Sequence, residues 1–320
     1  MAEAGMAMKA LLPTSVRPML EGRLPAGIEP LWWRDGDELV ALSPQAEIGW
    51  FDMFDKTAPK QAVAGAKGLK WLNTIFSGVD WMPLPDLQQR GVKLTNGSGL
   101  TANLVAEFAL TAMLGFARGY PQIVRAADRH EWLPPTHPLA TRELAGSRVL
   151  ILGYGAIGQA VERMLHGFRA QVTVVRRKGG EGALGPDEWR EQLQTFDWVV
   201  LALPGTPETK GLFDAATLAR LRSDAVLINV ARADVLDQQA LIAALHAGKL
   251  GGAVLDLTDP EPLPADHPLW SAPNCLVTMH QAGLPTPATR QAAADRFVAN
   301  CTRFLAGEAL VSEVDLGLGY

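Results

Sequence analysis

Three residues of complementary chemistry, Arg232, Glu261 and His280, each follow a short apolar run of the kind that forms a buried strand. The carboxyl ends of parallel strands meet at one edge of a sheet, where ligands of open α/β sheets bind, so we expect these side chains to converge. An arginine holds a carboxylate bidentately, and a histidine exchanges a proton near neutral pH. A carboxylate beside the second imidazole nitrogen favours the imidazolium. The set suits hydride transfer at C2 of a small 2-oxo or 2-hydroxy acid, with Arg232 as both a catalytic and a substrate-binding residue.

Each of these residues also has a plain structural interpretation, as a surface arginine, a loop charge or a residue that caps a strand. The other histidines lack a comparable position, and we expect them to be structural or exposed; they are His130, His137, His166, His246 and His267. No HExxH or similar spacing occurs. The sequence therefore predicts no metal site.

A glycine-rich turn predicts a dinucleotide site in the same half of the chain. Residues 153–158 read GYGAIG, follow an apolar run and precede a helical pattern, which is the context that the GxGxxG motif requires. The first glycine permits a tight turn, the second lets backbone amides approach a pyrophosphate, and the third lets helix and strand pack closely. A βα turn without a ligand is the alternative. The predicted cofactor-binding residues here are Gly153, Gly155, Ala156, Ile157 and Gly158.

Basic residues stand where an NAD-dependent enzyme offers an acid to the ribose 2′-hydroxyl, about 18 residues after the last glycine of the turn. These residues are Arg176, Arg177 and Lys178. A guanidinium can hold a 2′-phosphate through charge-assisted hydrogen bonds. We therefore predict NADP as the preferred cofactor, bound by Arg176 and Arg177, with NAD as a weaker alternative. A solvated basic strand end is the other interpretation.

From about residue 148 onward, short β-rich runs alternate with helical segments. Runs that are apolar on both faces and separated by helices indicate a parallel sheet that is covered on both sides. We expect strands at 149–152, 172–175, 198–203, 225–230, 253–257 and 276–279, and helices at 157–168 and 287–305.

The first hundred residues mix short apolar runs with turn signals. We expect strands at 39–42, 47–51, 70–75 and 92–95, followed by a helix at 102–117 that is apolar on most faces. The length of 320 residues suggests two domains. We predict an α/β protein in which a Rossmann-type doubly wound parallel sheet is inserted in a smaller flavodoxin-like substrate domain. The expected parts are 1–102 (substrate domain), 103–285 (dinucleotide-binding domain) and 286–320 (a helix returning to the substrate domain).

Composition narrows the possible functions. Hydrophobic residues make up 48% of the chain and charged residues 20%, as in ordinary globular proteins. The net charge of -5 predicts no surface for nucleic acid, and the apolar runs are too short for a membrane span. Two cysteines, Cys275 and Cys301, are too few for a disulfide framework. Because the start also lacks the pattern of a signal peptide, we expect a cytoplasmic protein.

From about residue 70 to the end, these motifs and their order resemble the D-isomer-specific 2-hydroxyacid dehydrogenases. The segments around Arg232, Glu261 and His280 are similar to the family's catalytic Arg, Glu and His motifs, and residues 144–147 lead into the glycine turn as in the family. The resemblance implies an NAD(P)-dependent enzyme, here similar to the NADP-preferring glyoxylate and hydroxypyruvate reductases. It also implies a homodimer formed through the cofactor domain.

The resemblance implies further site residues. Residues 77–80 resemble the family's substrate loop, whose amides bind the substrate carboxylate, so Ser77 and Gly78 are expected to bind substrate. Residues 203–209 resemble a cofactor-lining loop. The remaining cofactor-binding residues that we expect are Leu203, Pro204, Thr209, Val230, Ala231, Asp256 and Gly283. Trp132 resembles an aromatic residue that reaches the partner's active site in some members, although ordinary interface packing is the plainer interpretation.

Three positions depart from the family pattern. Met279 stands in place of a proline, Thr258 in place of a phenylalanine, and Ala233 in place of a glycine. Two other functions stay open: a phosphite-type dehydrogenase on the same fold, and a dinucleotide-sensing corepressor without turnover. Glu261 argues against formate oxidation, because formate-oxidising relatives are expected to lack this acid. A corepressor would need partner-binding extensions, and no long tail follows the last predicted helix.

Overall fold

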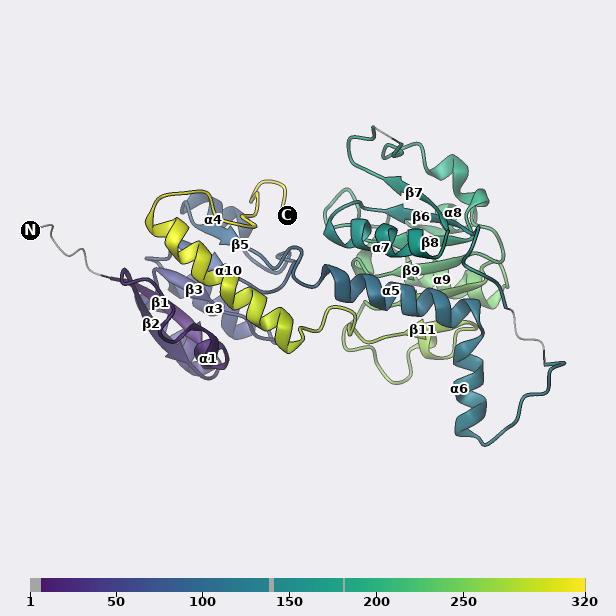
Figure 1. The fold of residues 1–320 in the computed structure, drawn as a ribbon, viewed down its shortest axis with the longest axis horizontal. Helices are drawn as coiled ribbons and strands as arrows, with labels where there is room; N and C mark the ends of the chain where they lie inside the picture. The colour runs from purple at the N-terminus through teal and green to yellow at the C-terminus, as the bar shows by residue number, and fades with distance from the viewer. Residues whose placement is uncertain (1–6, 138–140, 181, 320) are drawn as a thin grey trace, which may run out of the picture. The chain divides into compact units, whose positions relative to one another are not determined.

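The computed structural model describes residues 7–137, 141–180 and 182–319. The chain forms two compact units (Figure 1). One unit comprises Met1–Thr101 together with Pro285–Tyr320, and the other comprises Ala102–Leu284. Each unit is built around one parallel β-sheet with helices against it. The predicted fold class, two α/β units with parallel sheets, is therefore confirmed.

The sheet of the first unit has the strand order β2-β1-β3-β4-β5, and its paired strands are parallel, as in flavodoxin-like folds. Its strands are β1 (Met8–Pro13), β2 (Ile28–Trp33), β3 (Ile48–Trp50), β4 (Trp71–Asn73) and β5 (Lys93–Thr95). Its helices are α1 (Arg17–Leu20), α2 (Gly36–Leu42), α3 (Thr57–Gly65), α4 (Leu84–Gln89) and α10 (Pro287–Leu305). Phe297 of α10 packs on Trp50 and Trp71, with ring centroids 5.2 and 5.0 Å away. The C-terminal helix therefore completes the core of this unit.

One predicted strand of this unit is wrong: residues 39–42 lie in helix α2. Asp35 caps this helix, because its side chain accepts a hydrogen bond of 2.9 Å from the backbone amide of Glu38. Four apolar residues are too few for their periodicity to separate a strand from a buried helical turn. The sequence pattern also misses β1 and the edge strand β2, which contains Pro30, a residue excluded from central strands.

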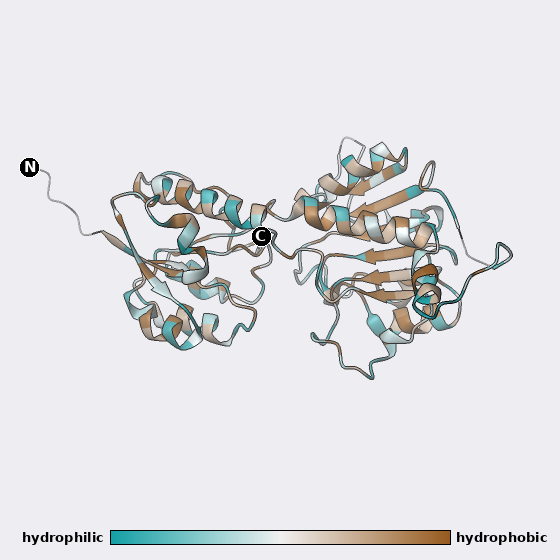
Figure 2. Ribbon diagram, turned by 60° about the horizontal axis from the view of Figure 1, so that its bottom comes forward, coloured by the Kyte–Doolittle hydropathy of each residue, from teal (hydrophilic) through white to brown (hydrophobic). Residues whose placement is uncertain are grey.

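The sheet of the second unit has the order β11-β10-β9-β8-β6-β7, again with parallel pairs. Its strands are β6 (Arg148–Leu152), β7 (Gln171–Val175), β8 (Trp198–Leu201), β9 (Val226–Asn229), β10 (Gly252–Leu255) and β11 (Cys275–Val277). The order in which the chain adds strands to the sheet reverses between β6 and β8, and this is the switch point where doubly wound sheets bind ligands. The strands are almost entirely hydrophobic, as Figure 2 shows, because both faces are covered.

Helices cover both faces of this larger sheet. Buried residues of α5 (Ala102–Ala117) and α7 (Ala156–Gly167) pack on one face, where Val149 and Ile151 point. Buried residues of α8 (Ala215–Leu218) and α9 (Gln238–His246) pack on the other, with Leu150 and Leu152. Helix α6 (Tyr120–Asp128) buries little of its own surface. Short 3-10 helices lie at Thr14–Val16, Ser43–Gln45, Arg190–Thr195, Ala233–Val235 and Pro268–Trp270.

A helix that spans a membrane needs about 20 consecutive, mostly apolar residues. Within residues 7–137, 141–180 and 182–319, no helix combines the length and the apolar composition needed to cross a bilayer.

Candidate active site

A buried asparagine shapes the turn after β9 that presents Arg232. Asn229 is fully buried; its side-chain oxygen accepts from the Ala231 amide at 3.0 Å, and its side-chain nitrogen donates to the Arg232 carbonyl at 2.9 Å. The Arg232 guanidinium donates to the Ala231 carbonyl at 2.8 Å. Gly205 lies against this side chain, since a Cβ there would come within 2.9 Å of the Arg232 Cγ. The sequence prediction omits Asn229, whose signal is a polar residue at the end of an apolar strand.

The turn after β11 places His280 in a strained backbone conformation. Met279 and His280 both have left-handed φ angles, 58° and 56°, which residues other than glycine adopt at a cost. A proline at position 279 would be locked near a φ of about -65°. The departure of Met279 from the family pattern therefore matches the turn that this chain forms.

The side chain of Asp256, which directly follows β10, stabilises this turn. Its side chain is only 3% exposed and accepts hydrogen bonds from the Thr278 hydroxyl at 2.8 Å and from the amides of Gln281 and Ala282 at 2.9 and 3.2 Å. Its carbonyl accepts from the His280 amide at 2.6 Å. Asp256 was expected only as a cofactor-binding residue. Its contacts in this structure are with the turn that carries His280, so Asp256 positions that residue.

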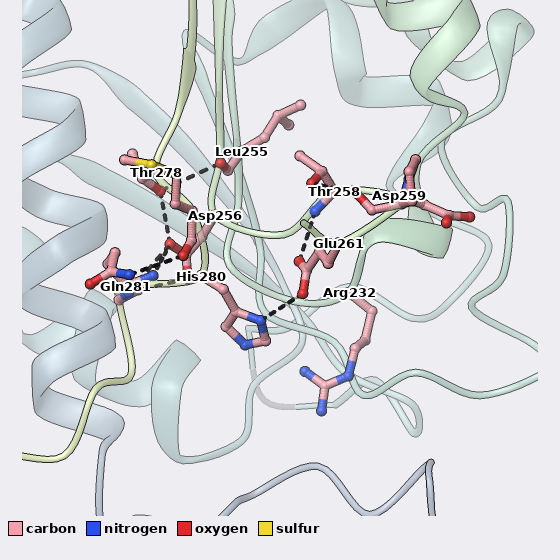
Figure 3. Close-up of polar contacts among 12 residues, drawn as sticks. Arg232, Leu255, Asp256, Thr258, Asp259, Glu261, Thr278, His280 and Gln281 are labelled. Atoms are coloured by element: carbon pink, nitrogen blue, oxygen red, sulfur yellow. Dashed lines mark hydrogen bonds and ion pairs between the residues drawn. The ribbon is translucent and has the colours of Figure 1, made fainter. Parts of the chain in front are cut away.

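Glu261 and His280 face each other across the site (Figure 3). The Oε2 atom of Glu261 lies 3.0 Å from Nδ1 of His280, and Oε1 accepts from the Thr258 amide at 3.0 Å. The hydroxyl of Thr258 donates to the Pro260 carbonyl at 3.1 Å, which closes the loop that carries the acid. Thr258 is thus a second supporting residue that the sequence prediction does not include.

Glu261 and His280 shift each other's pKa. The hydrogen bond that His280 donates to Glu261 raises the pKa of His280 above its ordinary value, although burial and Arg232 oppose this. Partial burial works to raise the pKa of Glu261, but the hydrogen bonds from His280 and the Thr258 amide outweigh it, so this pKa lies below its ordinary value. The pair therefore favours a carboxylate beside an imidazolium.

The structure thus brings together Arg232, Glu261 and His280 at the carboxyl edge of one sheet (Figure 3). The side chains of His280 and Glu261 stay 52% and 38% exposed, so a small molecule can reach them. Nε2 of His280 has no hydrogen bond within the described part of the chain, and it is the atom available to a reacting oxygen. The arrangement can hold an anion and exchange a proton beside it.

The glycine turn has the geometry that a dinucleotide phosphate requires. Gly153 has a φ of 95°, and a Cβ there would lie 2.4 Å from the Ala202 carbonyl oxygen. A Cβ on Gly158 would lie 2.1 Å from the Gly153 carbonyl oxygen, so α7 packs against the turn only with a glycine at this position. Gly155 faces open space and begins α7 without a side-chain cap. The free amides of the first helical turn, at Ala156 and Ile157, therefore suit a phosphate group.

The other predicted cofactor residues lie in loops of the same unit. Leu203, Pro204 and Thr209 follow β8, where the Thr209 hydroxyl donates to the Pro204 carbonyl at 2.8 Å and accepts from the Thr206 amide at 2.9 Å. Val230 and Ala231 directly follow β9, and Gly283 directly follows the turn that Asp256 holds. These loops extend from the carboxyl ends of their strands, as the glycine turn does.

The two basic residues after β7 have different surroundings. The Cζ atom of Arg176 lies 4.4 Å from the ring centroid of Tyr154, within the glycine turn. Arg177 lies nearer the loop after β8, where the Thr206 hydroxyl and, more weakly, the charge of Arg177 lower the pKa of Glu208. Both arginines therefore lie at the carboxyl edge of the larger sheet, as the glycine turn does.

Ser77 and Gly78 lie in the first unit, after β4, whereas Arg232 belongs to the second unit. The Ser77 carbonyl accepts from the Asn96 side chain at 2.8 Å, and its hydroxyl donates to the Gly97 carbonyl at 3.3 Å. Partly buried Asp52 supports the start of this loop, because its side chain accepts a hydrogen bond of 2.7 Å from the Ile75 amide. Burial raises the pKa of this carboxyl.

Metal ligands and thiols are the other groups that could react in a site of this kind. The described residues contain no group of three or more His, Cys, Asp or Glu side chains arranged to hold a metal ion. Cys275 and Cys301 are both free and buried, and burial raises the pKa of each thiol to about 12. Neither thiol is therefore a candidate nucleophile.

A twisted parallel sheet with a glycine turn at its switch point, and with an arginine and a His–Glu pair at its carboxyl edge, defines a dinucleotide-dependent dehydrogenase. Residues 110–282 match the family model of the D-isomer specific 2-hydroxyacid dehydrogenase NAD binding domain. The chain belongs to this family. It is accordingly an NAD(P)-dependent oxidoreductase that acts on CH–OH donors.

Similar proteins support this assignment along most of the chain. The glyoxylate reductase/hydroxypyruvate reductase of Mus musculus is 32% identical over 270 residues, which cover 82% of each chain. A family member from Aeromonas salmonicida has a solved structure with a TM-score of 0.85 and 30% identity, covering 97% of this chain and 99% of its own. A D-isomer specific 2-hydroxyacid dehydrogenase from Xanthobacter autotrophicus, solved with NADPH and MES, has a TM-score of 0.80 and 29% identity, covering 98% and 100%.

Proposed function

We propose that this protein reduces a small 2-oxo acid at C2 with NADPH, and that its substrate is of the glyoxylate or hydroxypyruvate type. The observation that carries this proposal is the contact of 3.0 Å between His280 Nδ1 and Glu261 Oε2, with Arg232 beside the pair. The mouse relative named above is a glyoxylate and hydroxypyruvate reductase, which supports the substrate class.

Each catalytic residue has one role in this proposal. Arg232 binds the substrate carboxylate bidentately, and the amides of Ser77 and Gly78 assist it. His280 donates a proton from Nε2 to the oxygen on C2, and Glu261 keeps Nδ1 protonated and the ring charged. The reduced nicotinamide, when bound, supplies the hydride. In the oxidative direction the neutral imidazole takes the proton back.

The preference for NADP rests on Arg176 and Arg177. A carboxylate at this strand end would accept the ribose 2′-hydroxyl of NAD and repel a 2′-phosphate, whereas guanidinium groups attract the phosphate. The relative from Xanthobacter autotrophicus was solved with NADPH, which supports the same cofactor here. NAD is a weaker substitute.

A substrate panel tests this function directly. We expect purified protein to oxidise NADPH, followed by its absorbance, with glyoxylate or hydroxypyruvate, and less rapidly with the bulkier phenylpyruvate. Reduction of NADP with phosphite, together with no activity on the 2-oxo acids, would instead identify a phosphite-type dehydrogenase. Tight NADPH binding without turnover of any of these compounds would identify a dinucleotide sensor. Either result contradicts the proposal.

The assembly and the location of the protein are also proposals. We propose that Ala102–Leu284 is the cofactor domain, that the other unit is the substrate domain, and that the protein is a cytoplasmic homodimer formed through the cofactor domain. Exposed apolar side chains on α6, among them Tyr120 and Val124, border a groove of about 310 Å³ and suit a second copy of the same surface. The two unpaired cysteines suit a reducing compartment.

A further inference from the structure

A tyrosine in the glycine turn contacts one of the two arginines that the proposed function assigns to the 2′-phosphate. Tyr154 is the second residue of the turn, and Arg176 directly follows β7. The Arg176 Cζ atom lies 4.4 Å from the centroid of the Tyr154 ring. At this distance the negative face of the ring attracts the guanidinium.

The ring of Tyr154 is itself held in place. Its hydroxyl donates a hydrogen bond to Glu162 on α7, and its carbonyl accepts one of 3.3 Å from the Gln159 side chain. The hydrogen bond to Glu162 raises the pKa of the Tyr154 phenol, so the hydroxyl stays a donor at neutral pH. The ring is therefore a fixed surface at the start of α7, and not a freely rotating side chain.

Arg177 differs in this respect. Its charge acts on Glu208, in the loop after β8, so it lies near a carboxylate. Arg176 instead lies over the neutral Tyr154 ring, whose face attracts the guanidinium, and it also acts on the Tyr154 hydroxyl, where it opposes the rise in pKa that Glu162 causes. Of the two arginines, Arg176 is the one that the fold holds ready for an added anion.

We propose that Tyr154 is a positioning residue for NADP recognition, whose ring holds the Arg176 guanidinium ready for the 2′-phosphate of the adenosine ribose. The inference rests on the proposed preference for NADP. An arginine that is already ordered loses less side-chain entropy when the phosphate binds, and this smaller loss increases the affinity. The ligand class is an adenosine phosphate with a phosphate on the 2′ oxygen.

Two small ligands isolate the contribution of the 2′-phosphate. Adenosine 2′,5′-bisphosphate carries this group, and adenosine 5′-monophosphate lacks it. Isothermal titration calorimetry gives the Kd of each for the wild type, Arg176→Ala, Tyr154→Leu, Tyr154→Phe and the double variant Tyr154→Leu/Arg176→Ala. The quantity compared is the ratio of the two Kd values, because general damage to the glycine turn weakens both ligands and leaves their ratio unchanged.

The wild type is expected to prefer the bisphosphate. Arg176→Ala should lower this preference about tenfold or more, and Tyr154→Leu should lower it roughly two- to fivefold, the range for an exposed cation–π contact. Tyr154→Phe keeps the ring face but loses the hydroxyl that bonds Glu162, so it should keep more of the preference than Tyr154→Leu. Tyr154→Leu should have no further effect in the Arg176→Ala background, because it acts through Arg176.

The contrary outcomes separate the two proposals. A wild type that binds both ligands equally contradicts the NADP preference and the inference with it. If Arg176→Ala lowers the preference as expected but Tyr154→Leu does not, the NADP preference stands and the role of Tyr154 is wrong. The role is also wrong if Tyr154→Leu lowers the preference equally in both backgrounds, or if Tyr154→Phe loses as much as Tyr154→Leu.

Discussion

Arg232 is the residue for which the proposed function requires a particular shape as well as a charge. Its guanidinium can form two parallel hydrogen bonds to a carboxylate, which a lysine ammonium cannot. We expect Arg232→Ala to lower kcat/KM for glyoxylate by at least about tenfold, since each charge-assisted hydrogen bond is worth about 1.5–3 kcal/mol. Arg232→Lys should recover little of this loss. Steady-state kinetics of both variants at one pH measure it, and a lysine variant with near-normal kcat/KM would show that Arg232 is not the carboxylate clamp.

The sequence predicts the individual catalytic residues better than it predicts the residues that hold them in position. Arg232, Glu261 and His280 could be selected because each follows an apolar run, and parallel strands share a carboxyl edge. Asn229 is visible in the sequence as a polar residue at the end of an apolar run, but its role in shaping the Arg232 turn depends on hydrogen bonds to backbone atoms, which the sequence does not show. The left-handed turn at Met279 and His280 has only a weak signal, because methionine does not favour that conformation and histidine adopts it in a minority of cases.

The element that depends most closely on one residue is helix α7, which packs against the glycine turn. Because a Cβ on Gly158 would lie 2.1 Å from the Gly153 carbonyl oxygen, Gly158→Ala should destabilise the protein by about 1–3 kcal/mol. It should also weaken NADPH binding. Gly167→Ala, at the other end of α7, is the matched control, because a Cβ there meets nothing within 4 Å. Urea denaturation measures both variants; equal free energies of unfolding would contradict the close packing at Gly158.

The helices and strands were predictable where the hydrophobic pattern was long or where apolar runs had clear ends. Helices α5 and α10 have the predicted bounds, 102–117 and 287–305, because their periodic patterns extend over many residues. The strands of the larger sheet were predictable from runs that are apolar on both faces. Residues 39–42 show the limit: the cap at Asp35, and not the four apolar residues, decides that this segment is helical.

The whole molecule is expected to work as a homodimer, and α6 offers a test. Val124 lines the apolar groove between α5 and α6, and Trp132, after α6, is 94% exposed. We expect sedimentation velocity to show a dimer for the wild type. Val124→Lys should shift it toward monomer, because a lysine charge would be buried against the partner. Gln122→Lys, an exposed neighbour on the same helix, should not. A monomeric wild type, or equal behaviour of the two variants, would contradict this assembly.

The central claim for the whole enzyme is that His280, charged with the help of Glu261, donates the proton during reduction. The Glu261 hydrogen bond raises the pKa of His280, and reduction needs the imidazolium, so the rate should fall as pH rises through that raised pKa. Glu261→Gln removes the charge and nearly preserves the shape, so the pKa of His280 should fall. His280→Ala should lose the limb together with roughly 10²–10⁴-fold of the rate.

The most direct measurement is therefore the pH profile of kcat/KM for glyoxylate reduction at saturating NADPH, in the wild type and in Glu261→Gln. The alkaline limb of the variant is predicted to lie at lower pH than that of the wild type. The limb for oxidation of the product, which needs neutral imidazole, should move to lower pH as well. An alkaline limb that stays in place in Glu261→Gln, or moves to higher pH, would contradict the pairing of His280 with Glu261 on which the proposed mechanism depends.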